Sequence, residues 1–219
     1  MKKMFLFLTS VLVSAMIYSQ ESKMAIGFQV APSITSIRGN TLIDRYDSRF
    51  VFSPGITIDY KITNHISFNS GLAFERKGAK SNTRYLDNQT TFPTTSQDFK
   101  FHFDYLTLPL MFVYNTNTEV NFYIGGGNFL GFLVSEKINF SKPNDDVDDI
   151  LGLNESTKKI DFGLSFLAGI TTSVNNKLVL DIGLRDYMGL VNISRYYVVN
   201  NGAIKTNSYS LVIGLKYKI

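Results

Sequence analysis

Only two histidines occur in the 219-residue chain, and one of them stands where general-base chemistry is conceivable. His102 and Asp104 lie two residues apart, so a strand would place both side chains on one face. A carboxylate beside a histidine can orient the imidazole toward a serine nucleophile, but no motif identifies that serine. His65 falls in a polar turn and is most simply a surface residue. We therefore expect no catalytic residue and a protein that is not an enzyme.

The glycine run 125–127, followed by Asn128, invites comparison with phosphate-binding loops. The dinucleotide-binding pattern requires a glycine at position 130, which is Leu130, and a strand–helix–strand unit around it. Glycines inside a strand more often permit bending or close packing. We interpret the run as part of a strand and expect no cofactor.

The acidic segment 144–149, with Glu155 after it, could offer oxygen ligands to Ca²⁺. It lacks the glycine that an EF-hand loop needs at its sixth position, because Gly152 is displaced. A solvated acidic loop is the simpler interpretation. The chain has no cysteine, which excludes disulfides, a lipoprotein anchor and cysteine-based zinc sites. We expect no metal site.

The elements that must position these residues show a two-residue period. In 208–219, the apolar residues Tyr209, Leu211 and Ile213 alternate with small or charged ones, and 50–62 and 159–171 repeat the pattern. A helix would instead group apolar residues three or four positions apart. We predict strands at 24–37, 50–62, 65–78, 98–114, 118–138, 159–171, 177–190 and 208–219.

The connections between these strands alternate in length. Tight polar turns lie at 63–65, 115–118 and 175–176, whereas the polar stretches 38–49, 79–98, 139–157 and 191–206 are long. Short turns at one end and long loops at the other are typical of outer-membrane barrels whose termini are periplasmic. The predicted fold is all-β, an eight-stranded antiparallel up-and-down transmembrane β-barrel.

The direction of the side chains decides the environment of such a barrel. An eight-stranded barrel has an interior just wide enough for side chains to fill. The Phe, Ile and Leu set is too bulky for that interior and must point outward, which is favourable only in lipid. A soluble ligand-binding barrel would reverse the two faces. Around Pro109 the apolar positions change face relative to Phe99, Phe101 and Phe103, so we expect a bulge there.

Charged residues of both signs fall on the inward face, and in a narrow lumen they must pair. Counted from the tight turns, Glu75, Asp104 and Arg185 lie at similar heights. An arginine fork can bind carboxylates bidentately across a narrow lumen. We therefore expect a structural lumen charge cluster of Arg185 with Glu75, Asp104 or both.

The N-terminus has the features of a secretory signal peptide. Lys2 and Lys3 precede the apolar stretch 4–17, which is too short to span a membrane and ends in a polar exit. We expect cleavage after Ser19 or Gln20, so that 1–20 is a signal peptide and 21–219 is one barrel domain. The formal net charge of +4 includes Lys2 and Lys3, which leave with the signal peptide. The remaining charge is nearly balanced, and this argues against a nucleic-acid partner.

Four segments resemble the PorT-like outer-membrane β-barrel family of Bacteroidetes. They are 71–78, with its aromatic, basic and glycine ending, Tyr105-Leu106-Thr107-Leu108-Pro109, Ile160-Asp161-Phe162-Gly163, and 187–193, with its aromatic-x-Gly-Leu-x-Asn-Ile pattern. The resemblance covers nearly all of the mature chain. It implies an outer-membrane barrel of a Gram-negative bacterium and no shared chemistry.

Together these observations predict a non-catalytic, monomeric barrel with a side-chain-filled lumen. It would act in envelope structure or surface interaction through four long extracellular loops, with outer-membrane lipids and an envelope or surface protein as partners. The alternative is a narrow pore or transporter for small polar solutes, although open aqueous channels generally need about 16–18 strands.

Overall fold

The computed structural model describes residues 23–39, 44, 46–81, 99–140, 156–198 and 202–219. The expected signal peptide, the acidic segment 144–149 and Glu155 lie outside the described residues. Among the described residues, no helix has the length and apolar character needed to cross a membrane.

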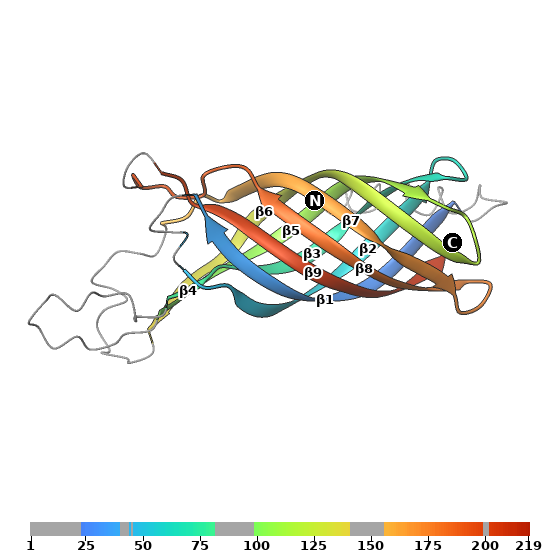
Figure 1. Cartoon of the computed structure of the whole chain (residues 1–219), viewed down its shortest axis with the longest axis horizontal. Helices are drawn as coiled ribbons and strands as arrows, with labels where there is room; N and C mark the ends of the chain where they lie inside the picture. Colours follow the sequence, from blue (N-terminus) through green and yellow to red (C-terminus); the bar gives the residue numbers. More distant parts are fainter. Residues whose placement is uncertain (1–22, 40–43, 45, 82–98, 141–155, 199–201) are drawn as a thin grey trace, which may run out of the picture.

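Nine strand segments make up nearly all of the regular structure (Figure 1). They are β1 (Met24–Arg38), β2 (Arg49–Lys61), β3 (Ile66–Lys77), β4 (Lys80–Ser81), β5 (Phe99–Asn115), β6 (Val120–Phe140), β7 (Ile160–Ser173), β8 (Leu178–Gly189) and β9 (Lys205–Lys218). Segment β4 continues β3, because Lys77 pairs with Phe103 and Lys80 pairs with Lys100 in one unbroken register against β5. The wall therefore has eight strands, and the predicted strand number is confirmed.

Each strand pairs antiparallel with its neighbours along the chain, and the pairings of β1 with β9 and of β3 with β5 close the sheet into a barrel. We call the end that holds the tight turns 62–65, 116–119 and 174–177 the turn end, and the opposite end the loop end. The start of β1 meets the end of β9 at the turn end, where the Ile219 amide donates to the Met24 carbonyl at 2.8 Å. Asn117 takes a left-handed conformation in one of these turns, with φ of 59°.

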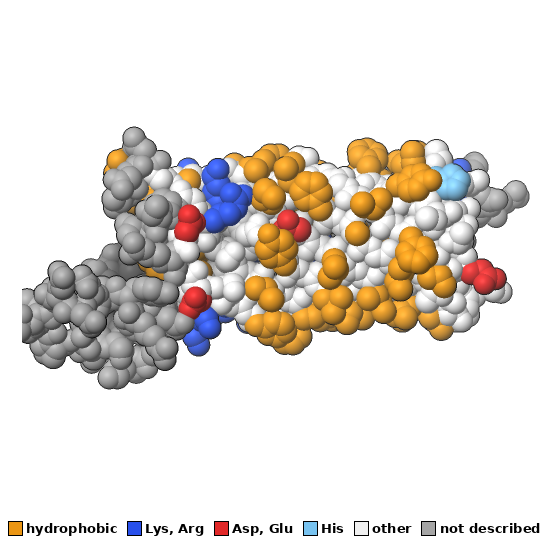
Figure 2. Space-filling model, viewed as in Figure 1, with side chains coloured by type: hydrophobic (Ala, Val, Ile, Leu, Met, Phe, Trp, Pro, Cys, Tyr) orange, Lys and Arg blue, Asp and Glu red, His pale blue; other side chains and the backbone are white. Residues whose placement is uncertain are grey.

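The outer surface of the barrel is apolar, and its interior is polar. Phe28, Phe112 and Ile124 are 57–64% exposed, whereas Ser53, Thr107 and Ser165 are fully buried. Figure 2 shows hydrophobic side chains spread over the middle of the wall, while most charged side chains of that view gather toward the two ends. The predicted direction of the faces is thus confirmed for the barrel as a whole.

Strand β5 is where the prediction of side-chain direction was wrong. One alternation runs through the strand, so that Phe103, Tyr105 and Met111 all face inward and no bulge occurs at Pro109. The register instead shifts between Asp104, which pairs with Ser135, and Tyr105, which pairs with Leu133. The extra residue therefore belongs to β6, and the sequence of β5 carries no sign of it.

Candidate functional site

The interior is filled by layers of side chains, whose order along the barrel follows β3. Asn69, Glu75, Lys77 and Ala79 face inward in that order from the turn end to the loop end. Each of the first three contributes to a layer of polar contacts, and Ala79 belongs to an apolar cluster above them.

The middle layer contains the expected pair of Arg185 and Glu75. The Arg185 Nη2 atom lies 2.8 Å from Glu75 Oε1, and both side chains are buried. Ser53 Oγ donates to the second carboxylate oxygen at 3.1 Å. The guanidinium also lies over the Tyr187 ring, with Cζ 4.6 Å from the centroid. Glu75 on β3 and Arg185 on β8 thus meet across the lumen.

Asp104, the third residue expected in this cluster, lies elsewhere. It faces the outside of the barrel, where its Oδ1 atom is 3.1 Å from Nε of Arg76. Arg76 is about half exposed, since 49% of its side chain is accessible. Asp104 faces outward because the alternation of β5 places its neighbours Phe103 and Tyr105 in the lumen.

A second layer, closer to the loop end, joins Lys77 and Asp161. Lys77 Nζ lies 2.8 Å from Asp161 Oδ2, and neither side chain is exposed. Thr206 Oγ1 donates to the same carboxylate oxygen at 2.6 Å. The ammonium also lies 4.1 Å from the centroid of the Phe129 ring, which compensates for part of its lost hydration. The inward position of both charges follows from alternation, but their pairing does not.

The third layer, nearest the turn end, centres on Lys216. Its Nζ atom bridges Asp59 at 2.6 Å and Asp181 at 2.8 Å. Asp59 accepts a further bond from Asn69 Nδ2 at 2.6 Å, and Asp181 accepts one from Tyr123 Oη at 2.7 Å. Residues from five strands, β2, β3, β6, β8 and β9, therefore share one network, which leaves both carboxylates partnered.

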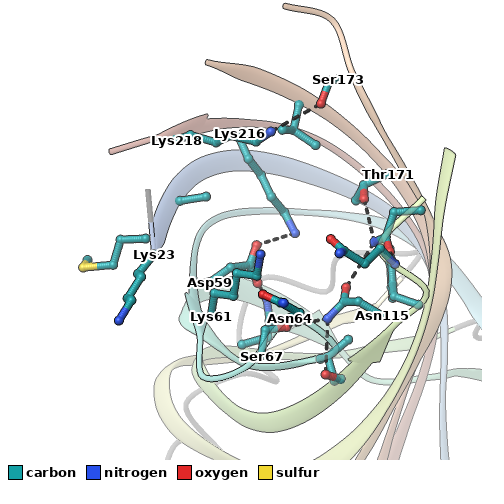
Figure 3. A pocket seen from close by; sticks show the side chains of 18 of the residues that line it. Lys23, Asp59, Lys61, Asn64, Ser67, Asn115, Thr171, Ser173, Lys216 and Lys218 are labelled. Atoms are coloured by element: carbon teal, nitrogen blue, oxygen red, sulfur yellow. Dashed lines mark hydrogen bonds and ion pairs between the residues drawn. The ribbon is translucent and has the colours of Figure 1, made fainter. Parts of the chain in front are cut away.

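A cavity of about 860 Å³ lies beneath this layer at the turn end (Figure 3). Lys216 reaches down from its strand toward Asp59, and the wall around them carries amide and hydroxyl side chains that bond to one another. Asn115 Nδ2, for example, donates to Ser67 Oγ at 2.9 Å, and Asn121 Nδ2 donates to Thr171 Oγ1 at 3.0 Å. Lys216 and Asp59 themselves belong to the lining of the cavity.

The loop end is filled by an apolar plug that the sequence did not indicate. It consists of the buried residues Ile37, Ala79, Phe103, Tyr105 and Ile193. Ile193 belongs to the segment that follows β8, and its amide donates to the Ile204 carbonyl at 2.8 Å. The sequence predicted that Phe103 faces the outside of the barrel. The plug therefore became evident only when the structure showed that this side chain of β5 faces inward.

The other candidate residues that the structure describes lie in the barrel wall. His102 lies outward on β5, on the same face as Asp104. The glycine run 125–127 is part of β6 and pairs with β5 and β7, as expected. Within the described ranges, no group of three or more His, Cys, Asp and Glu side chains is placed to hold a metal ion.

Comparison with known proteins extends these observations. The sequence pattern of the family described as outer membrane protein beta-barrel domain matches residues 18–195. The structure resembles Neisserial surface protein A, with a TM-score of 0.52 and 19% identity, over 90% of this chain and 97% of that one. It also resembles the outer membrane protein OprG of Pseudomonas aeruginosa, with a TM-score of 0.50 and 16% identity, over 90% and 94%. At such identities the likeness establishes the fold alone. No curated protein matches the sequence significantly.

Proposed function

Because the chain belongs to the outer membrane protein beta-barrel domain family, we propose that it is a non-conducting barrel of the outer membrane. It serves envelope structure or surface contacts through the connections at its loop end, between β1 and β2, β4 and β5, β6 and β7, and β8 and β9. Its four family-like segments support the further proposal that it is a PorT-like member.

The blocked lumen is the observation that supports this proposal. Three charged layers, centred on Lys216, Arg185 and Lys77, cross the interior one above another. The apolar plug around Phe103 and Ile193 lies above them. A hydrated ion or a polar solute would have to break buried ion pairs and then pass through an apolar constriction, and each step costs several kcal/mol.

Planar-bilayer recording of the mature protein tests the proposal directly. We expect no open-channel steps from the parent protein. The matched comparison is a variant with Lys77→Ala and Phe103→Ala, which removes part of one charged layer and of the plug and should increase ion leakage. Reproducible steps from the parent protein would instead establish the narrow pore or transporter.

A second test addresses the absence of catalysis. Turnover of a lipid or a peptide by the purified protein, abolished by His102→Ala, would contradict the non-catalytic role. Cross-linking in intact cells from cysteines placed in the loop-end connections would identify the surface or envelope partner. Cysteines in the turns 116–119 and 174–177 provide the control, because they are expected on the periplasmic side.

A further inference from the structure

Cationic side chains gather on the outer wall near the loop end, on β3, β4 and β5. Arg76 and Lys100 are exposed there, and Lys80 is half-buried. Lys80 and Lys100 are direct register partners, and the alternation of their strands places both on the outer face. Like charges directly opposite each other in a sheet are unfavourable, so this pair favours an anion close to both lysines.

The nearby carboxylates do not balance these cations. Asp104 faces Arg76 at 3.1 Å, and Asp47 is joined to Lys80 by a two-way backbone bridge. Arg49 adds a further cation, with its Nη1 donating to the Phe101 carbonyl at 2.7 Å. Among the described residues here, the three cations of the outer face and the nearby Arg49 therefore meet two acidic side chains.

The backbone also differs at this place from the rest of the barrel. The ladder between β2 and β3 runs from Lys61↔Ser67 only as far as Gly55↔Ala73, and the next pairing is the isolated bridge of Asp47 with Lys80. We call the interval between these two pairings the seam. Pro54 lies in it and has no amide hydrogen to donate. The wall thus lacks continuous strand pairing beside the cations.

Gly78 lies beside the point where Arg49 reaches across the seam. A Cβ atom on Gly78 would lie 3.5 Å from Arg49 Nη1 and 2.1 Å from the Phe101 carbonyl oxygen, and the φ of Gly78 is +137°. A side chain at this position would crowd the backbone that the guanidinium binds. The guanidinium of Arg49 therefore lies beside β5 and close enough to Arg76 for the two to interact electrostatically.

The depth of the cluster matches that of a lipid headgroup. Phe50 and Phe52 on β2 are 62% and 60% exposed, and their rings pack edge to face at 5.1 Å. Exposed aromatic residues mark the boundary between acyl chains and headgroups in such barrels. Leu72 lies exposed farther toward the turn end, on the apolar wall. Because long loops are extracellular, this boundary belongs to the outer leaflet.

We propose that the seam and its cations bind the phosphorylated headgroup of lipopolysaccharide in the outer leaflet. The phosphate lies against Arg76, Lys100 and Arg49, whose planar guanidiniums suit phosphate oxygens. The acyl chains lie along the apolar wall beside Phe52 and Leu72. This site does not depend on whether the lumen conducts ions.

Lipid titration of the mature protein, followed by native mass spectrometry, tests the site. The probes are lipid A with its phosphates and lipid A from which the phosphates have been removed. The parent protein should prefer the phosphorylated form. A variant with Arg76→Gln and Lys100→Gln should bind it roughly ten- to thirtyfold more weakly, since each cation near a charged lipid surface contributes about 1 kcal/mol and 1.4 kcal/mol is tenfold.

The matched control removes two exposed cations from the turn end, with Lys23→Gln and Lys177→Gln. This variant carries the same change of charge and should bind like the parent. Lys100→Gln alone provides a milder variant if the double substitution impairs folding. Equal affinity of the parent for both lipids, equal weakening by the control, or displacement by millimolar inorganic phosphate would each overturn the proposal.

Discussion

The buried pair of Arg185 and Glu75 shows how a single contact in the lumen is held in place. Neither side chain has access to bulk water, and the carboxylate accepts bonds from both Arg185 and Ser53. A charge left alone in such surroundings loses its hydration without compensation. The contact thus depends on both partners.

We predict that Arg185→Ala lowers the free energy of unfolding by about 3–5 kcal/mol, because it leaves the buried Glu75 carboxylate without its cation. Urea titration in lipid vesicles measures the loss. Arg76→Ala is the matched control, since it breaks a half-exposed pair with Asp104, and such pairs contribute about 0–1 kcal/mol.

A double variant distinguishes the cost of leaving one buried charge alone from the cost of losing the two side chains. Arg185→Met combined with Glu75→Leu removes both charges and should be far less destabilised than Arg185→Ala, because no lone charge remains. If the single and double variants unfold at the same urea concentration, the pair is not the source of the loss.

At the scale of the strand, alternation decides which residues meet lipid. Ile56, Leu164 and Leu211 lie on the outward face of β2, β7 and β9. We predict that an arginine at any of them costs about 2–4 kcal/mol of stability in vesicles, as expected near the middle of a bilayer. An arginine at Thr118 in a turn, which is exposed, should cost little. Parent-like stability of all three lipid-facing variants would refute the assigned direction.

The glycines of β6 provide a second test at this scale. A Cβ atom on Gly127 would lie 2.0 Å from the Leu110 carbonyl oxygen, whereas one on Gly126 would meet its nearest neighbour at 3.7 Å. We predict that Gly127→Ala destabilises the barrel by about 1–3 kcal/mol, because β5 and β6 must separate.

Gly126→Ala is the matched control for Gly127→Ala and should be close to neutral. Gly126 and Gly127 are neighbours on β6, and both variants replace a glycine by alanine. The difference between their unfolding midpoints therefore measures the effect of the close approach between β6 and the Leu110 carbonyl. Equal midpoints would show that this approach has no role in stability.

At the scale of the whole molecule, closure of the sheet should make the barrel resistant to denaturing detergent. The pairing of β1 with β9 joins the first and last described strands and closes the described sheet on itself. We predict that unheated and boiled samples migrate differently on a denaturing gel and that the protein fractionates with the outer membrane. Recovery in the soluble periplasmic fraction would contradict this prediction.

The eight strands and the inside-out arrangement of the faces could be predicted because both follow from local alternation. Along 50–62 and 208–219, each residue's type already indicates lipid or lumen. The same reasoning placed Glu75 and Arg185 inside, on strands that proved to be opposite each other. Alternation cannot choose partners, however, since these depend on the register of every strand in the closed barrel.

Strand β5 and the plug were decided only by the tertiary structure. Aromatic and apolar residues occupy both faces of β5, so alternation alone could not assign Phe103 to the lumen or Asp104 to the outer wall. Whether an interior accepts an aromatic ring depends on which side chains arrive from the other strands, and here Ile37 and Ile193 arrive from distant parts of the chain. The bridging of Asp59 and Asp181 by Lys216 has the same origin, because it exists only once the barrel has closed.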